Sequence, residues 1–143
     1  MDNRRWGAIY WEEKFNEDID DNLSYYNQYE GILFIEPPFA EITLSDGFWD
    51  ELNRKYDTLF DFAEEEELNA EIIPDIVKEI KNISKTKYNK SGNYEVVVGY
   101  KLGEQKKEIK LATTYEKLNE IINKLCEFLI EAHKKNKNII IML

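Results

Sequence analysis

Apolar side chains recur with helical spacing between Thr114 and Lys134. They fall at Tyr115, Leu118, Ile121, Ile122, Leu125, Leu129 and Ala132. This spacing of three and four places them on one face of an α-helix. Thr113 or Thr114 can cap the start, because a hydroxyl there can accept a hydrogen bond from a free backbone N–H. The pattern predicts a helix about 30 Å long that must bury its apolar face against a sheet or other helices.

Three other segments have patterns typical of β-strands. Residues 6–12 alternate, with Gly7, Ile9 and Trp11 on one face. Gly31–Glu36 and Asn138–Leu143 are short, continuous apolar runs, as in strands that are buried on both faces.

Pro37 and Pro38 end the second of these runs, because proline cannot donate a backbone hydrogen bond to a neighbouring strand. The segment Phe39–Leu44 is expected to form a further strand beyond this break.

A β-hairpin is predicted directly before the long helix. The apolar positions of its first strand alternate at Tyr94, Val96, Val98, Tyr100 and Leu102. Gly103–Glu104 suits a two-residue type II′ turn, which favours glycine at its first position. That turn would place Val98 opposite Ile109 and Val96 opposite Leu111, so that both strands share an apolar face.

Two more helices are expected in the middle of the chain. Ser45 or Asp46 can cap the first helix, and its apolar face comprises Phe48, Leu52, Tyr56, Leu59, Phe60 and Ala63. It should end near Glu66, because consecutive glutamates oppose the dipole at a helix C-terminus. Pro74 suits the first turn of the next helix, with apolar positions at Ile76, Val77, Ile80 and Ile83. The polar segment Lys81–Asn93 is expected to be a loop.

Together these elements predict one α+β domain over residues 1–143. A mostly antiparallel sheet would be covered by two or three helices, with a β-hairpin, the long helix and a strand forming the C-terminal unit. A chain of 143 residues is long enough to bury a core without covalent cross-links.

Composition favours a cytoplasmic protein. Cys126 is the single cysteine, so no internal disulfide can form, and nothing points to secretion. The first residues lack the apolar run of a signal peptide. No stretch approaches 18 apolar residues, so no association with a membrane is expected.

The net charge of −10 is unevenly distributed along the chain. Residues 1–77 hold 21 Asp and Glu against 5 Lys and Arg, whereas residues 78–143 hold 8 against 14. The acids of the segment 57–75 are Asp57, Asp61, Glu64, Glu65, Glu66, Glu67, Glu71 and Asp75. Such a field repels nucleic acid and attracts a basic protein. Alternatively, the two halves neutralise each other within the fold.

The acidic half is also the aromatic half. Residues 1–62 contain 14 of the 19 Phe, Trp and Tyr residues, and Tyr and Trp often anchor protein interfaces. The candidate anchors are Trp6, Trp11, Tyr25, Tyr26, Tyr29 and Trp49. The alternative for each of them is a place in the core.

Motifs for catalysis or metal binding are not recognisable. Asp18, Asp20 and Asn22 begin like a calcium-binding loop, but Leu23 occupies the position of the required glycine. His133 is the single histidine, and a zinc site needs further His or Cys ligands. We therefore expect no catalytic residue, no metal and no cofactor.

In overall character the chain resembles small acidic bacterial immunity and antitoxin proteins, which bind one basic toxin and block its active site. The resemblance lies in size, acidity and aromatic residues among acids, covers residues 6–75 at most, and implies a stoichiometric inhibitor of a basic toxin such as a nuclease. Two alternatives remain open: a small carboxylate-based or metal-dependent hydrolase, and a general protein-interaction module. The oligomeric state is left undetermined.

Overall fold

A computed structural model describes residues 7–15, 30–56, 65–103 and 105–143 of the chain. The strands are β1 (Gly7–Trp11), β2 (Ile32–Ile35), β3 (Glu65–Leu68), β4 (Asn93–Lys101), β5 (Lys107–Thr114) and β6 (Ile139–Met142). The helices are α1 (Glu12–Phe15), α2 (Pro37–Ser45), α3 (Phe48–Tyr56), α4 (Ile73–Lys87) and α5 (Tyr115–Lys134). The α+β class is therefore confirmed, including the hairpin, long helix and strand at the C-terminal end.

The main sheet has four strands in the order β2-β1-β6-β3, and every neighbouring pair is antiparallel. Strand β6 lies inside the sheet, between β1 and β3. Ile141 of β6 is opposite Ile9 on one side and opposite Glu66 on the other. The strands predicted around residues 6–12, 31–36 and 138–143 are all present.

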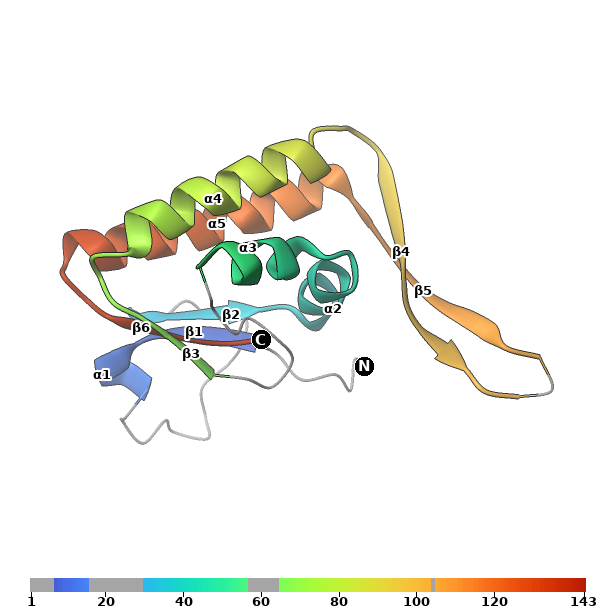
Figure 1. Cartoon of the computed structure of the whole chain (residues 1–143), viewed down its shortest axis with the longest axis horizontal. Helices are drawn as coiled ribbons and strands as arrows, with labels where there is room; N and C mark the ends of the chain where they lie inside the picture. The colour runs from blue at the N-terminus through green and yellow to red at the C-terminus, as the bar shows by residue number, and fades with distance from the viewer. Residues whose placement is uncertain (1–6, 16–29, 57–64, 104) are drawn as a thin grey trace.

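One face of this sheet carries the core. Its buried members are Ile9, Trp11, Ile35, Leu68, Ile139 and Ile141. Helices α3, α4 and α5 lie over the sheet, and α4 and α5 run side by side in opposite directions (Figure 1). The predicted apolar face of α5 is buried at Leu118, Ile122, Leu125, Leu129 and Ala132. The Thr114 hydroxyl caps α5 by accepting a hydrogen bond from the Lys117 N–H at 3.1 Å.

The strand predicted over Phe39–Leu44 is wrong, because this segment belongs to helix α2. Pro37 and Pro38 occupy its first positions, where a missing N–H costs no intrahelical hydrogen bond. A buried hydrogen-bond chain then fixes the helix: Thr43 donates to the Phe39 carbonyl at 2.8 Å, and the Trp49 indole N–H donates to Thr43 at 2.8 Å. The two prolines therefore start a helix as well as ending a strand.

Two element boundaries also differ from the prediction. Glu65–Leu68 forms strand β3 rather than the end of a helix, because pairing with β6 places Leu68 in the core. The segment Lys81–Asn93 is mostly helical, since α4 continues to Lys87. Its buried face continues through Ile83 and Ser84, and basic residues in its last turn suit the helix dipole.

The hairpin of β4 and β5 forms a separate two-stranded sheet that extends away from the rest of the molecule (Figure 1). We call these two strands and their connection the arm. Val96 pairs with Leu111 as predicted, but Ile109 lies opposite Gly99 instead of Val98. Val98 is the extra residue of a β-bulge, in which two residues of one strand face one of the other. The predicted two-residue turn is also wrong, because residues 102–106 lie between the strands.

Gly31 provides a test of the packing around Trp11. A Cβ atom at Gly31 would lie 2.7 Å from the Trp11 ring, and the backbone has φ +78°. Gly47 has φ +85° but open space around its Cβ position. Gly47→Ala should therefore lose only the backbone term, roughly 1–2 kcal/mol. Gly31→Ala should lose about 1–3 kcal/mol more, because the methyl group displaces the indole. Urea unfolding of both variants measures the difference, and equal losses would contradict this packing.

Candidate functional site

The described part of the predicted acidic segment, residues 65–75, forms an edge strand of the main sheet and the start of α4. Asp57, Asp61 and Glu64 lie outside the described residues. The backbone of Glu65, Glu66 and Glu67 forms β3, the last strand of the main sheet. Beyond that strand, Glu71 and Asp75 are exposed. The described part of the segment is therefore an edge strand followed by a helix N-terminus.

Strand geometry divides these acids between two faces. Glu66 is opposite Ile141, whose side chain points into the core, whereas Glu67 is opposite Ile140. Cross-strand pairs lie on the same face of a sheet, and consecutive residues lie on opposite faces. Glu66 is accordingly half-buried, and Glu67 is exposed. The exposed acidic side chains in this part of the described structure are those of Glu67, Glu71 and Asp75, which we call the acidic edge.

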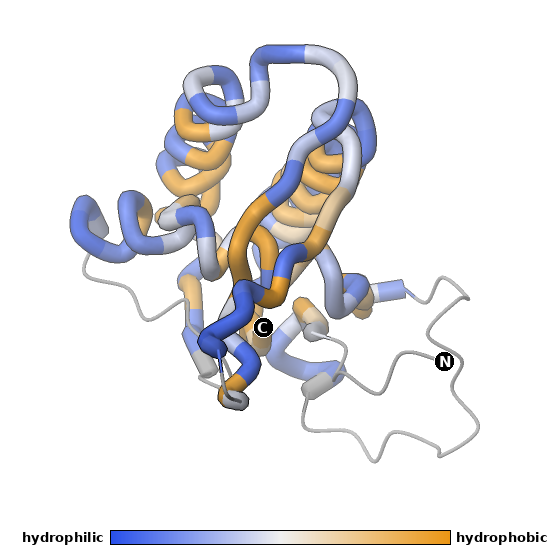
Figure 2. The backbone as a smooth tube through the Cα atoms, turned by 90° about the vertical axis from the view of Figure 1, so that its right-hand side faces the viewer, coloured by the Kyte–Doolittle hydropathy of each residue, from blue (hydrophilic) through white to orange (hydrophobic). Residues whose placement is uncertain are grey.

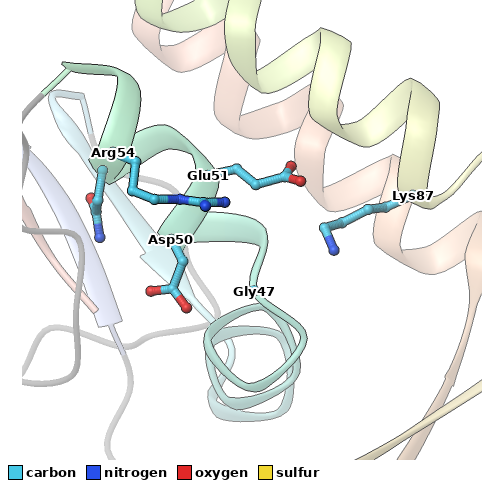
Figure 3. A pocket seen from close by; sticks show the side chains of 6 residues that line it. Gly47, Asp50, Glu51, Arg54 and Lys87 are labelled. Atoms are coloured by element: carbon cyan, nitrogen blue, oxygen red, sulfur yellow. The ribbon is translucent and has the colours of Figure 1, made fainter.

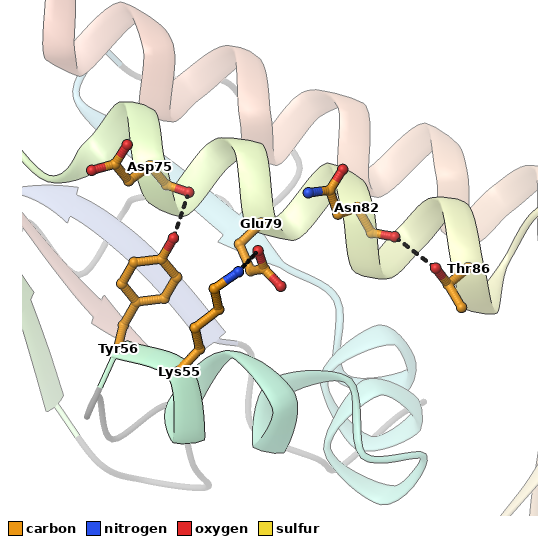
Figure 4. A network of polar contacts seen from close by, with 6 residues as sticks. All are labelled: Lys55, Tyr56, Asp75, Glu79, Asn82 and Thr86. Atoms are coloured by element: carbon orange, nitrogen blue, oxygen red, sulfur yellow. Dashed lines mark hydrogen bonds and ion pairs between the residues drawn. The ribbon is translucent and has the colours of Figure 1, made fainter.

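Contacts between α3 and α4 adjoin the acidic edge (Figure 4). The Lys55 ammonium donates to Glu79 at 2.8 Å, and this hydrogen bond raises the pKa of Lys55. The Tyr56 hydroxyl donates to the Asp75 carbonyl at 3.4 Å. Asp75 itself lies in the first turn of α4, where a negative charge is favoured by the helix dipole. The Lys55–Glu79 pair joins a base of the acidic half to an acid of the basic half, so it does not neutralise the acids of residues 57–75.

The predicted aromatic anchors are not available on the surface where they are described. Trp49 is 2% exposed and Trp11 is 6% exposed, so both belong to the core. This corrects the expectation that they contact a partner. The physical reason is their position: Trp49 lies on the buried face of α3 with Phe48 and Leu52, and Trp11 lies on the inner face of β1. Tyr25 and Tyr26 lie outside the described residues.

Trp11 is covered by the basic segment that follows α5. The ammonium groups of Lys135 and Lys137 each lie 5.3 Å from the centre of the Trp11 ring, within the range of a cation–π interaction. Lys137 also pairs with Glu13, and this contact lowers the pKa of the Glu13 carboxyl. The indole Nε1 is buried and has no hydrogen-bond partner within the described structure. The tryptophan therefore holds the chain's two end segments together instead of offering a surface.

A polar cluster that the sequence did not reveal joins the arm to the body. The Asp46 carboxylate accepts hydrogen bonds from the Phe48 N–H at 3.0 Å, the Tyr88 hydroxyl at 2.6 Å and the Tyr94 hydroxyl at 2.8 Å. Lys87 donates to the Asp46 carbonyl at 2.9 Å. These residues come from the α2–α3 connection, the end of α4 and the start of β4. We call this cluster the Asp46 junction.

Aromatic rings extend the junction toward α5. The ring of Tyr88 stacks on Phe48 at 5.7 Å and meets Tyr94 edge-on at 5.8 Å. Tyr94 meets Tyr115, the first residue of α5, at 5.0 Å. The sequence contained one signal for this cluster, the prediction of Asp46 as a helix cap. Nothing in the spacing of the tyrosines indicated that they share its carboxylate.

The two phenols of the Asp46 junction act as hydrogen-bond donors. Burial raises the pKa of Tyr88 first, and the neighbouring Asp46 carboxylate raises it further. Burial and the hydrogen bond to Asp46 likewise raise the pKa of Tyr94. Both phenols thus stay protonated and donate to the carboxylate, whereas a general base needs a pKa near the working pH.

An open depression of about 680 Å³ lies beside the junction (Figure 3). Its lining residues are Gly47, Asp50, Glu51, Asn53, Arg54 and Lys87. The Glu51 side chain points toward Lys87, and Asp50 points away from both. The two carboxylates therefore do not converge as a carboxylate-based hydrolase requires.

The remaining residues considered for metal binding are His133 and those that resemble the start of a calcium-binding loop. The Nδ1 atom of His133 lies 2.7 Å from the Ala70 carbonyl oxygen, a contact that joins α5 to the β3–α4 connection. Asp18, Asp20 and Asn22 lie outside the described residues. Among the residues that are described, no three His, Cys, Asp or Glu side chains gather in a way that could hold a metal ion. In the same part of the chain, no helix has the length and apolar character needed to cross a membrane.

The tyrosines of the Asp46 junction should make the protein sensitive to alkali. Tyr88 is fully buried, and its pKa in the fold is raised above the ordinary 10.0. The unfolded chain thus loses the Tyr88 proton first, and stability must fall as the pH rises above about 10. The slope approaches about 1.4 kcal/mol per pH unit for one such group. Tyr88→Phe should show a shallower decline between pH 9 and 11 in urea unfolding than the parent. Parallel declines would contradict the prediction.

Cys126 should be chemically inert in the native protein. Its side chain is buried on α5, and burial raises the pKa of the thiol to about 11. Little thiolate forms at neutral pH, and a reagent cannot reach it without opening of the fold. A thiol reagent should react slowly with native protein and quickly in denaturant. Equal rates in the two conditions would show that Cys126 is accessible.

Comparisons with models of known families, with curated proteins and with solved structures return no match for this chain. Three exposed features of the described structure are the acidic edge, the open depression beside the Asp46 junction, and the arm.

Proposed function

We propose that the protein is a non-enzymatic binding protein of the cytoplasm, a stoichiometric inhibitor of a basic protein such as a nuclease toxin. One observation carries the proposal: the exposed carboxylates of Glu67, Glu71 and Asp75 lie along the edge strand β3 and the start of α4. The carboxylates of the depression, Asp50 and Glu51, diverge. A hydrolase is therefore not favoured by the described geometry.

Charge would act mainly on the rate of encounter. The chain carries a net charge of −10, and a field of one sign steers an oppositely charged partner toward its binding face. Exposed charges contribute less to holding the complex, because solvent and salt screen them. The acidic edge is thus proposed as the surface that selects a basic partner and orients it.

The same surface explains why a basic partner would be preferred over nucleic acid. Phosphate backbones are polyanions, and proteins that bind them neutralise the phosphates with Lys and Arg. The acidic edge carries negative charge, so it would repel the phosphates. An immunity-type role accordingly needs a partner whose own nucleic-acid-binding face is basic, and the acidic edge would occupy that face.

The proposal is tested by neutralising the acidic edge. The partner is first captured from the native host with the parent protein, purified, and used in association-rate measurements at two salt concentrations. The triple variant Glu67→Gln, Glu71→Gln and Asp75→Asn should associate roughly tenfold more slowly at low salt. Its deficit should shrink when salt shortens the screening length from about 30 Å to about 10 Å.

A control with the same change in net charge separates location from total charge. Glu120→Gln, Glu127→Gln and Glu131→Gln remove three exposed carboxylates from α5. This control should associate nearly as fast as the parent. If both variants slow association equally, only overall charge matters, and the acidic edge is not the binding face. Salt-independent association of the parent would overturn the electrostatic proposal altogether.

A further inference from the structure

Strand β5 of the arm has an outer edge that nothing in the described structure covers. Its partner is β4 alone, and β4 in turn packs against α2. Two-stranded ribbons are marginally stable in water, and an open edge is a template for pairing with another strand. Residues Lys107–Lys110 are all exposed. The arm extends away from the main sheet (Figure 1).

The arm also exposes large apolar side chains to solvent. Tyr100 is 52% exposed, Leu102 is 87% exposed and Ile109 is 45% exposed. Figure 2 shows apolar positions interleaved with polar ones along both strands of the arm. Ile109 and Leu111 line a shallow groove of about 400 Å³ between the arm and α2, together with Leu44 and Val98. Ile109 thus remains partly exposed although it borders this groove.

The charges of β5 are arranged to complement a second copy of the same strand. Glu108, Ile109 and Lys110 are consecutive, so Glu108 and Lys110 lie on one face and Ile109 lies on the other. In a symmetric antiparallel pair centred on Ile109, Glu108 of each copy faces Lys110 of the other. Centring the pair on Glu108 or on Lys110 would instead place like charges opposite each other, which is destabilising. One register therefore satisfies both charges and apolar contact.

From this pattern we infer that two copies of the chain associate through β5, edge to edge and antiparallel, with the two-fold axis at Ile109. The result is a four-stranded sheet in the order β4-β5-β5-β4. Ile109 packs on Ile109 of the second copy, and the two apolar grooves join into one. Interfaces of this isologous kind close on themselves as dimers.

Existing contacts within the arm keep the required groups in place. Lys110 lies 3.5 Å from Glu95 and 3.6 Å from Glu108 in the same chain. These ion pairs are exposed and weak. Exchanging one of them for a pair across the interface costs little, and the charged groups already lie on the face where the exchange takes place.

Analytical ultracentrifugation of the full chain tests this inference. The parent should change from monomer to dimer as the protein concentration rises from about 1 µM to about 1 mM, which places the expected Kd within this range. Ile109→Asp places two carboxylates at the axis and should raise the Kd by roughly a hundredfold. If the parent stays monomeric over this range, the proposal is overturned. This would also be the result if β5 paired with a different protein instead of a second copy.

Reversing the charges identifies the register. Glu108→Lys and Lys110→Glu, each alone, place like charges across the interface and should raise the Kd about tenfold. The double variant E108K/K110E restores both pairs in the opposite sense and should return the Kd to within about threefold of the parent. Failure of the double variant to restore association overturns the Ile109-centred register.

Lys101→Glu is the matched control for Lys110→Glu. It makes the same change in net charge on the same arm, but on β4, which faces away from the proposed interface. Its Kd should stay within about threefold of the parent. Thermal unfolding of every variant verifies that the fold is retained. Dimers that are equally sensitive to Lys101→Glu and Lys110→Glu would show that the β5 edge is not the interface.

Discussion

The placement of β6 inside the main sheet is the constraint on which the rest of the structure depends. Its two neighbours come from opposite ends of the first half of the chain. Strand β1 lies near the start, and more than fifty residues separate it from β3. Ile139 and Ile141 are buried on the core face. The sheet can therefore be completed only when the segment after α5 returns between two strands that lie much earlier in the sequence. Such long-range pairing pays a loop-closure entropy that burial of the isoleucines must offset.

The Asp46 junction performs a comparable role for the arm. A two-stranded ribbon has too little core to fix its own direction, so its orientation depends on contacts at its base. Tyr94 provides them by donating to the Asp46 carboxylate and packing against Tyr88 and Tyr115. Loss of the several hydrogen bonds that this carboxylate accepts would be energetically costly. The junction is therefore specific as well as stabilising. The base of the arm is consequently held by specific contacts, whereas its far half is exposed.

Charge in this protein divides between stability and recognition. Some groups neutralise each other within the fold, as Lys55 does with Glu79 and Lys137 with Glu13. Others, such as Glu67 and Glu71, remain exposed. The Lys137–Glu13 pair joins a base of the second half of the chain to an acid of the first, whereas the exposed carboxylates at the β3 edge are not neutralised in this way within the described structure. The arm differs from this edge, because its charges of opposite sign alternate closely along one strand.

The sequence by itself determined the elements with a clear apolar pattern. Helix α5, the apolar stripe of α4 and strand β1 follow from periodicity, and strands β2 and β6 follow from short continuous apolar runs, because burying these side chains outweighs other influences. The tertiary structure decided the remaining elements. Phe39–Leu44 is helical because Thr43 and Trp49 bond within the core, and Glu65–Leu68 is a strand because β6 offers it backbone partners. The acidic segment could be located from sequence, but not its division between two sheet faces or the burial of Trp11 and Trp49. Those depend on contacts between residues far apart in the chain, which local patterns do not encode.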